Sequence, residues 1–145
     1  MNENEKKLNF SKKQKAIGIC VILVVALVVL MLFLPSHFER VKDDAVDIAG
    51  RISSRGEGNF TIDTYPDIYE NMDATTKSFL APTWQEEALT AIQYANAEFG
   101  FSGAVYSKMM ETSALMGRQV EENYKYKVSW TYHPDDGLEV TYEKK

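Results

Sequence analysis

The longest apolar stretch of the chain covers residues 16–34, AIGICVILVVALVVLMLFL, and contains no charged side chain. At about 1.5 Å of rise per residue, these nineteen residues would form a helix slightly shorter than 30 Å. That length is close to the roughly 30 Å thickness of the hydrocarbon core of a membrane. The pattern therefore predicts a transmembrane helix over residues 16–34.

Charge on the two sides of this stretch predicts its orientation. Residues 1–15 contain five lysines and two glutamates, whereas acidic residues outnumber basic ones just after the stretch. The positive-inside rule then places a basic tail, residues 1–15, in the cytoplasm. A cleaved signal peptide is the alternative, but its apolar region is usually shorter and ends at small residues, which Leu34 and Pro35 are not. We therefore predict an uncleaved, single-pass protein of the cell membrane with its C-terminal domain outside the cytoplasm.

An amphipathic helix is predicted next, over residues 36–53. Ser36 and Glu39 have the spacing of a capping box, in which the serine side chain accepts a bond from the first turn. The apolar residues follow at steps of three and four, as in a coiled-coil seam. Two interpretations remain open, because this face either packs on the chain's own domain or mediates self-association as a stalk. The residues of this seam are Phe38, Val41, Ala45, Ile48 and Ile52.

The middle of the chain alternates between strand and helix signals. Apolar and polar residues alternate over residues 60–65, which predicts a short strand. Residues 67–70 have capping-box spacing and predict a short helix that ends before Pro82. Another capping box at residues 83–86 begins a helix that Gly100 ends, and a further helix is predicted from about residue 102 to Gly117. The last two helices would form a helical hairpin.

The C-terminal region has the clearest strand pattern. Large apolar residues alternate with polar ones over residues 124–133 and again over residues 138–143. If both apolar sets share one face, Tyr132 opposes Leu138 and Lys127 opposes Glu143. Residues 134–137, Pro-Asp-Asp-Gly, have the composition of a tight turn. We therefore predict a β-hairpin with this register and a positive φ at Gly137.

Together these elements predict the fold class and the domain organisation. We expect a single N-terminal transmembrane helix and a small α+β domain, whose short antiparallel sheet includes the C-terminal β-hairpin and is packed on one face by the helical hairpin. The predicted segments are a basic tail (1–15), a transmembrane helix (16–34), a juxtamembrane amphipathic helix (36–53) and an extracytoplasmic α+β domain (60–145).

Composition argues against several classes of function. Residues 35–145 contain 11 basic and 19 acidic residues, a net charge of −8, which argues against nucleic-acid binding. They contain two histidines and no cysteine, so a usual His and Cys zinc site cannot be built in one chain. His133 lies near Asp135 and Asp136 in sequence, but no nucleophile stands at a motif spacing from them. We therefore predict no catalytic residue, no metal site and no cofactor.

The remaining hypothesis is an extracytoplasmic binding or accessory domain that contacts another envelope or membrane protein. The alternatives are a self-assembling subunit that uses the 38–52 seam, and a small envelope enzyme or cell-wall sugar binder. Two patterns are candidates for a partner surface, although core packing is the simpler explanation of the aromatic row and a solvated face that of the acidic residues. They are an aromatic row (Tyr124, Tyr126, Trp130, Tyr132 and Tyr142) and an acidic stretch (Asp63, Asp67, Glu70 and Asp73).

Overall fold

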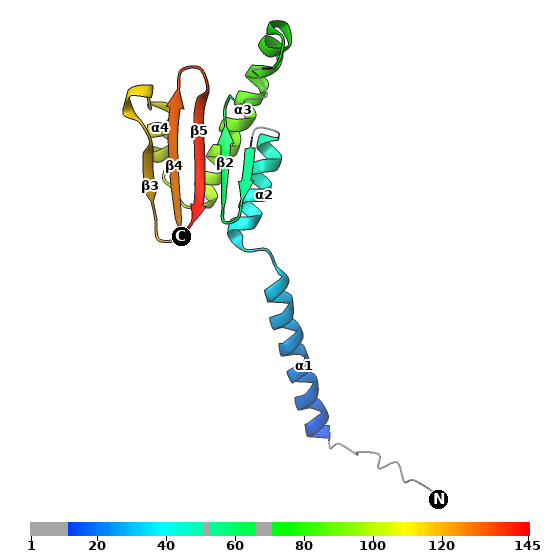
Figure 1. The fold of residues 1–145 in the computed structure, drawn as a ribbon. Helices are drawn as coiled ribbons and strands as arrows, with labels where there is room; N and C mark the ends of the chain where they lie inside the picture. Colours follow the sequence, from blue (N-terminus) through cyan, green and yellow to red (C-terminus); the bar gives the residue numbers. More distant parts are fainter. Residues whose placement is uncertain (1–11, 51–52, 66–70) are drawn as a thin grey trace, which may run out of the picture. The chain divides into compact units, whose positions relative to one another are not determined.

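The structure is a computed structural model that describes residues 12–50, 53–65 and 71–145 of the chain (Figure 1). The chain divides into two compact units, and the boundary lies between Pro35 and Ser36. The first unit contains one helix, α1 (Lys12–Phe33). The second unit contains all other described elements, so each unit is presented by itself below.

Helix α1 contains most of the long apolar stretch that was predicted to span a membrane. The side chains that the structure describes in this helix belong to residues 17–31, and all of them are exposed. Within the described part of the chain, no helix has both the length and the apolarity needed to cross a membrane. This finding contradicts the predicted transmembrane helix over residues 16–34, the single-pass topology and the membrane localisation.

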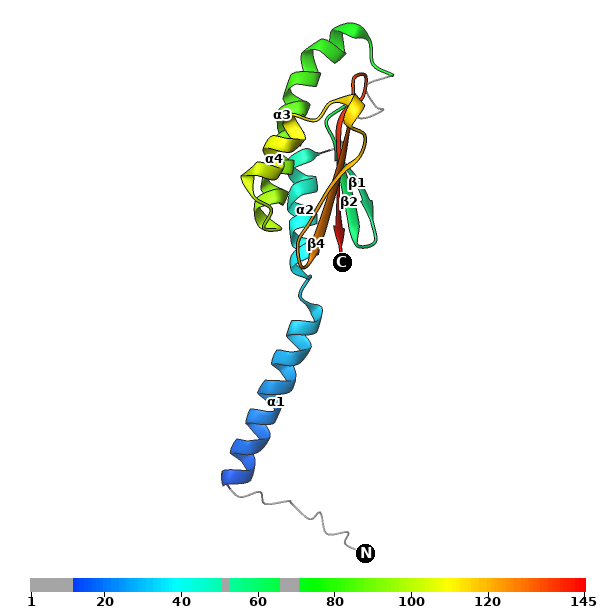
Figure 2. The same ribbon diagram turned by 90° about the vertical axis from the view of Figure 1, so that its left-hand side faces the viewer.

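The second unit is a small α+β domain built from one five-stranded sheet and a layer of helices. The sheet is antiparallel throughout, in the order β1-β2-β5-β4-β3. Its strands are β1 (Ser53–Gly56), β2 (Asn59–Asp63), β3 (Gln119–Glu122), β4 (Tyr126–His133) and β5 (Gly137–Lys144). The helices are α2 (His37–Ala49), α3 (Ala74–Glu98) and α4 (Gly103–Met110), followed by the short 3₁₀ helix η2 (Ala114–Met116). Figure 2 shows the sheet edge-on, with α2, α3 and α4 on the same side of it.

The hydrophobic core lies between the helices and the sheet. Aromatic rings fill its centre, where the ring centroid of Phe38 lies 5.3 Å from that of Phe99 and 5.8 Å from that of Phe60. The Phe60 ring stacks on Tyr142 at 5.0 Å. Aromatic pairs at these separations add to the stability that burial itself provides. Because Phe38 belongs to α2, this helix is part of the domain core and not a separate stalk.

The predicted β-hairpin is confirmed in its register and in its turn. Tyr132 opposes Leu138, and Lys127 opposes Glu143. Gly137 has a φ of 75°, a backbone conformation that side chains with a Cβ rarely adopt. The alternation of apolar residues was sufficient to predict this register, because a shift by one residue would turn the whole apolar set of one strand to the opposite face.

Several other element boundaries differ from the sequence prediction. Helix α3 runs through Pro82, so the predicted break before that residue and the new helix at Thr83 are wrong. Its N-terminus is at Asp73, whose carboxylate accepts the backbone N–H groups of Thr75 and Thr76 at 3.1 and 3.0 Å. This cap starts the helix nine residues before Thr83, and the N-terminal half of α3 extends beyond the end of the sheet (Figures 1 and 2). The capping box predicted at residues 67–70 lies outside the described residues.

The sheet also contains two strands that were not predicted, β1 and β3. Both have four residues, both lie at the edges of the sheet, and neither has an apolar alternation. Backbone pairing with β2 and β4 defines these strands, and backbone pairing leaves no trace in the order of side chains. The predicted helix up to Gly117 is also shorter, since α4 ends at Met110 and the chain then turns towards β3.

Candidate functional site

A cleft of about 880 Å³ opens at the end of the domain where the β4–β5 turn lies. Four segments that are distant in sequence form its walls: the two residues after β2, the part of α3 between Lys77 and Leu89, the end of α4 with the residues after it, and the β4–β5 turn. Ligand sites in proteins commonly occupy about 300–1,000 Å³, so the cleft is large enough to hold a ligand or a peptide segment.

Apolar side chains line the base and one side of the cleft. Met109 and Leu138 are buried beneath it, and Leu89 packs against the same core. Above them, Met110 and Tyr132 are 44% and 36% exposed, although both are large apolar residues. Partly exposed side chains of this kind around a hollow are typical of binding sites, because a ligand removes them from water.

Polar groups surround this apolar base. The amino group of Lys77 lies 4.8 Å from the ring centroid of Tyr65, a cation–π contact between α3 and the residue just after β2. The Oγ1 of Thr64 accepts a hydrogen bond from the backbone N–H of Leu138 at 2.8 Å. The backbone N–H of Thr64 donates to the Leu138 carbonyl at 2.9 Å. These bonds hold the end of β2 against the β4–β5 turn and so maintain one wall of the cleft.

The rim of the cleft also carries two carboxylates, those of Asp135 and Asp136 in the β4–β5 turn. The Nδ1 of His133 lies 3.8 Å from Oδ2 of Asp136, and both side chains are largely exposed. Among the residues that the structure describes, no three His, Cys, Asp or Glu side chains gather closely enough to hold a metal ion.

The wall formed by the end of α4 is attached to the sheet by a buried hydrogen bond. The indole Nε1–H of Trp130 donates to Oγ1 of Thr112 at 2.7 Å, and the Thr112 hydroxyl donates to the Lys108 carbonyl at 2.7 Å. Thr112 therefore satisfies the indole of β4 and ends α4 at the same time. This contact sets the distance between the sheet and the Met110 side of the cleft.

We expect Thr112→Val to lower the free energy of unfolding by about 1–3 kcal/mol, because the buried Trp130 indole loses its acceptor. Urea denaturation would measure the change. Thr90→Val is the matched control, since the Thr90 hydroxyl bonds the Glu86 carbonyl on an exposed helix face. Similar losses of unfolding free energy in the two variants would show that the hydrogen bond to the indole adds no stability of its own.

A second buried polar contact joins α3 to the sheet away from the cleft. The Tyr142 hydroxyl is within hydrogen-bond distance of the Ile92 carbonyl and of Asn96 Oδ1, both at 3.1 Å. Complete burial raises the pKa of the Tyr142 phenol well above its usual value of 10, so it remains a neutral donor. On the exposed side of the helices, a hydrogen bond to Asp44 raises the pKa of Tyr94 to about 12. Both groups stabilise the packing of helices and do not form a site.

The structure separates the members of the predicted aromatic row. Tyr126, Trp130 and Tyr142 are buried in the core. Tyr124 is 93% exposed and lies before β4 begins, whereas Tyr132 is near the other end of that strand and lines the cleft. Core packing therefore accounts for three of the five residues, and Tyr132 is the one that the structure brings to the cleft.

The acidic stretch is not gathered into a common surface by the described residues. The Asp63 carboxylate accepts the backbone N–H of Tyr65 at 2.8 Å and stabilises the turn after β2. Asp73 caps α3, and the hydrogen bond from the Thr76 side chain lowers the pKa of the Asp73 carboxyl. Asp67 and Glu70 lie outside the described residues. Both placed carboxylates thus have local roles in the fold.

The predicted self-association seam faces the domain's own core. Phe38, Val41 and Ala45 are buried there, and Ile48 packs against the same cluster while partly exposed. Ile52 lies outside the described residues. With these side chains buried inside the domain, the seam is not accessible to a second copy, which favours the first of the two interpretations of this helix.

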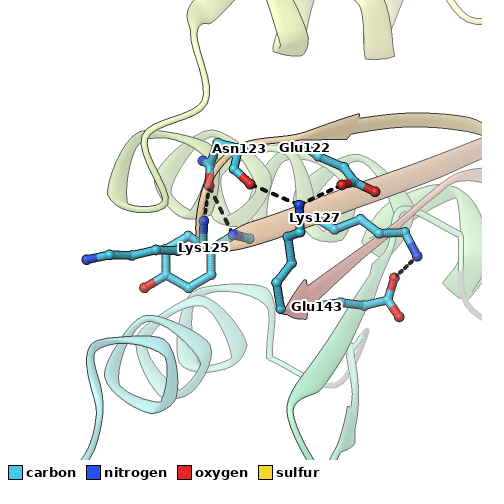
Figure 3. A network of polar contacts seen from close by, with 7 residues as sticks. Glu122, Asn123, Lys125, Lys127 and Glu143 are labelled. Carbon is cyan, nitrogen blue, oxygen red and sulfur yellow. Dashed lines mark hydrogen bonds and ion pairs between the residues drawn. The ribbon is translucent and has the colours of Figure 1, made fainter.

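A network of ion pairs lies at the other end of the hairpin, away from the cleft (Figure 3). The Nζ of Lys127 lies 2.5 Å from Oε2 of Glu143 on the neighbouring strand. The Nζ of Lys145 lies 2.7 Å from Oε2 of Glu122. The Asn123 side chain accepts the backbone N–H of Lys125 at 3.0 Å, which forms the turn between β3 and β4. Exposed pairs of this kind contribute little stability each, and the network closes the strand ends without forming a cavity.

No family model, no curated protein and no solved structure matches this chain. Most residues of the cleft were missed by sequence reasoning, among them Lys77, Leu89, Met110 and Thr112. They come from segments that only the tertiary structure brings together, and no spacing in the sequence relates them.

Proposed function

We propose that the domain formed by residues 36–145 is a non-catalytic binding domain whose cleft holds a segment of a partner protein. The observation that carries this proposal is the pairing of exposed apolar walls, Met110 and Tyr132, with a rim of polar groups around one cavity of about 880 Å³. Methionine side chains adapt to different apolar partners, and tyrosine presents both a ring and a hydroxyl. An extended peptide has the shape and mixed chemistry to use such walls.

The binding of a sugar is a second candidate, because two tyrosines and two carboxylates line the cleft. Sugar rings are usually held by stacking on a free aromatic face. Lys77 already lies over the Tyr65 ring, however, so one face of that ring is occupied. Two methionines and two leucines line the cleft beside the two tyrosines. A protein segment therefore accounts better for the lining.

Photocrosslinking in cells tests this proposal. A benzophenone amino acid is placed at Met110, inside the cleft, or at Phe79, which is 81% exposed on α3 but does not line it. We expect one defined protein adduct from position 110, identified by mass spectrometry, and none of that mass from position 79. Equal adducts from the two positions, or no protein adduct at position 110, would contradict a partner-binding cleft.

Truncation of Met110 gives the matching affinity prediction. Met110→Ala removes an exposed apolar wall, so the complex with the crosslinked partner should weaken about tenfold, which is about 1.4 kcal/mol. Phe79→Ala should leave the affinity unchanged. Titration of the purified partner with each variant measures both values. Unchanged affinity in Met110→Ala would remove this side chain from the binding surface.

A further inference from the structure

We propose that the segment bound in the cleft carries a lysine or arginine next to an apolar side chain, and that its positive charge lies against Asp135 and Asp136. This inference rests on the proposed function, since it names the chemistry of the partner at the same cleft. Its support comes from the two carboxylates of the β4–β5 turn, from the exposed apolar wall, and from the charge of the whole domain.

One lysine and two aspartates line the cleft. Lys77 lies on the α3 side and is engaged with the Tyr65 ring. Asp135 and Asp136 lie on the β4–β5 turn, and among the described residues no lysine or arginine comes within ion-pair distance of either carboxylate. The basic side chain beside them is that of His133, whose Nδ1 lies 3.8 Å from Oδ2 of Asp136. A positive group that approaches this rim therefore finds two carboxylates that no lysine or arginine of the described residues neutralises.

The apolar wall lies in the same cavity as the two carboxylates. Met110 is 44% exposed, and burial of its side chain by a partner would add apolar stabilisation beside the ionic contact. A lysine or arginine has an aliphatic stem that can lie along such a wall while its charged end reaches the rim. The two features together therefore favour a basic residue with an apolar neighbour over an acidic segment.

The charge of the whole domain acts in the same direction. Residues 35–145 have a net charge of −8, so a basic segment is attracted at long range and an acidic one is repelled. A partner segment could also bind by adding a strand to the edge of the sheet, but this edge is a less favourable site than the cleft. The edge strand β3 is only four residues long and ends in Glu121 and Glu122, features that oppose pairing with another chain.

Fluorescence anisotropy with the full-length chain tests the inference. The probes are three labelled octapeptides in which leucine alternates with lysine, glutamine or glutamate. The double variant Asp135→Asn with Asp136→Asn removes the two rim charges. The control, Asp47→Asn with Glu86→Gln, removes two exposed carboxylates that do not line the cleft.

We expect the lysine peptide to bind most tightly, to lose about tenfold in affinity in the rim variant, and to be unchanged in the control. An equal loss in both variants would overturn the inference, because overall charge and not the rim would then explain binding. If lysine and glutamine peptides bind equally and only Met110→Ala weakens them, the proposed function stands and the charge inference fails. If no peptide binds while a chitotetraose probe does, both proposals fail.

Discussion

Replacement of Phe38 by alanine should lower the free energy of unfolding by about 3–5 kcal/mol, the usual cost of removing a fully buried phenylalanine. Phe38 is 1% exposed, and its ring contacts those of Phe60, Phe99 and Tyr126 at centroid distances of 5.3–6.0 Å. Its removal leaves a cavity at the centre of the domain, where α2 meets the sheet and α3. The loss should appear as a lower urea midpoint with an unchanged slope.

Phe79→Ala is the control for this prediction, because the same atoms are removed from a side chain that is 81% exposed. Its effect on the unfolding free energy should be within about 0.5 kcal/mol. If Phe38→Ala left stability unchanged and instead converted an oligomer into a monomer, α2 would be an external stalk and not a core helix. Sedimentation of both variants distinguishes these outcomes.

Gly137→Ala should lower the unfolding free energy by about 2–4 kcal/mol, from two separate causes. The φ of 75° is unfavourable for any residue with a Cβ. In addition, a Cβ at this position would lie 2.5 Å from Oγ1 of Thr64 and 3.2 Å from Cβ of Tyr65. The clash would displace the hydroxyl that accepts the Leu138 N–H, so the wall of the cleft would move as well.

Gly58→Ala separates the two causes, since Gly58 has a φ of 73° but no atom within 4 Å of an added Cβ. This variant should lose only the backbone contribution, about 1–2 kcal/mol. Thermal and urea unfolding of both variants give the comparison. Equal losses would mean that the approach of Thr64 to Gly137 costs nothing, and that the cleft wall is adaptable. A larger loss in Gly137→Ala should be accompanied by weaker binding of the partner segment.

Local sequence patterns were sufficient to predict those features of the fold that one short pattern specifies. The hairpin register followed from the alternation around Trp130 and Val140, because a slip would expose every buried side chain of one strand. The cap at Ser36 was likewise readable, and its Oγ accepts the Glu39 N–H at 3.3 Å. The prediction from local pattern was wrong at Pro82. Helix α3 is capped nine residues earlier, at Asp73, and continues through this proline.

The long apolar stretch shows the limit of arguing from composition. Length and apolarity over residues 16–34 predicted a membrane span, yet no helix in the described part of the chain meets the requirements for crossing a membrane. The seam of α2 was similarly ambiguous, since steps of three and four serve both a coiled coil and a helix that packs on its own domain. Burial of Phe38 and Val41 in the core resolved that ambiguity.

The sequence by itself determined the α+β class of the domain, the hairpin with its positive-φ glycine, and the apolar face that α2 buries. Each of these depends on a pattern within one segment or in neighbouring segments of the chain, so the order of apolar and polar residues can express it. The tertiary structure alone decided the edge strands β1 and β3 and the cleft. Strand pairing at an edge uses backbone groups that every residue has, and the cleft joins Lys77, Met110 and Asp136 across long separations. Contacts of that kind exist only once the chain has folded.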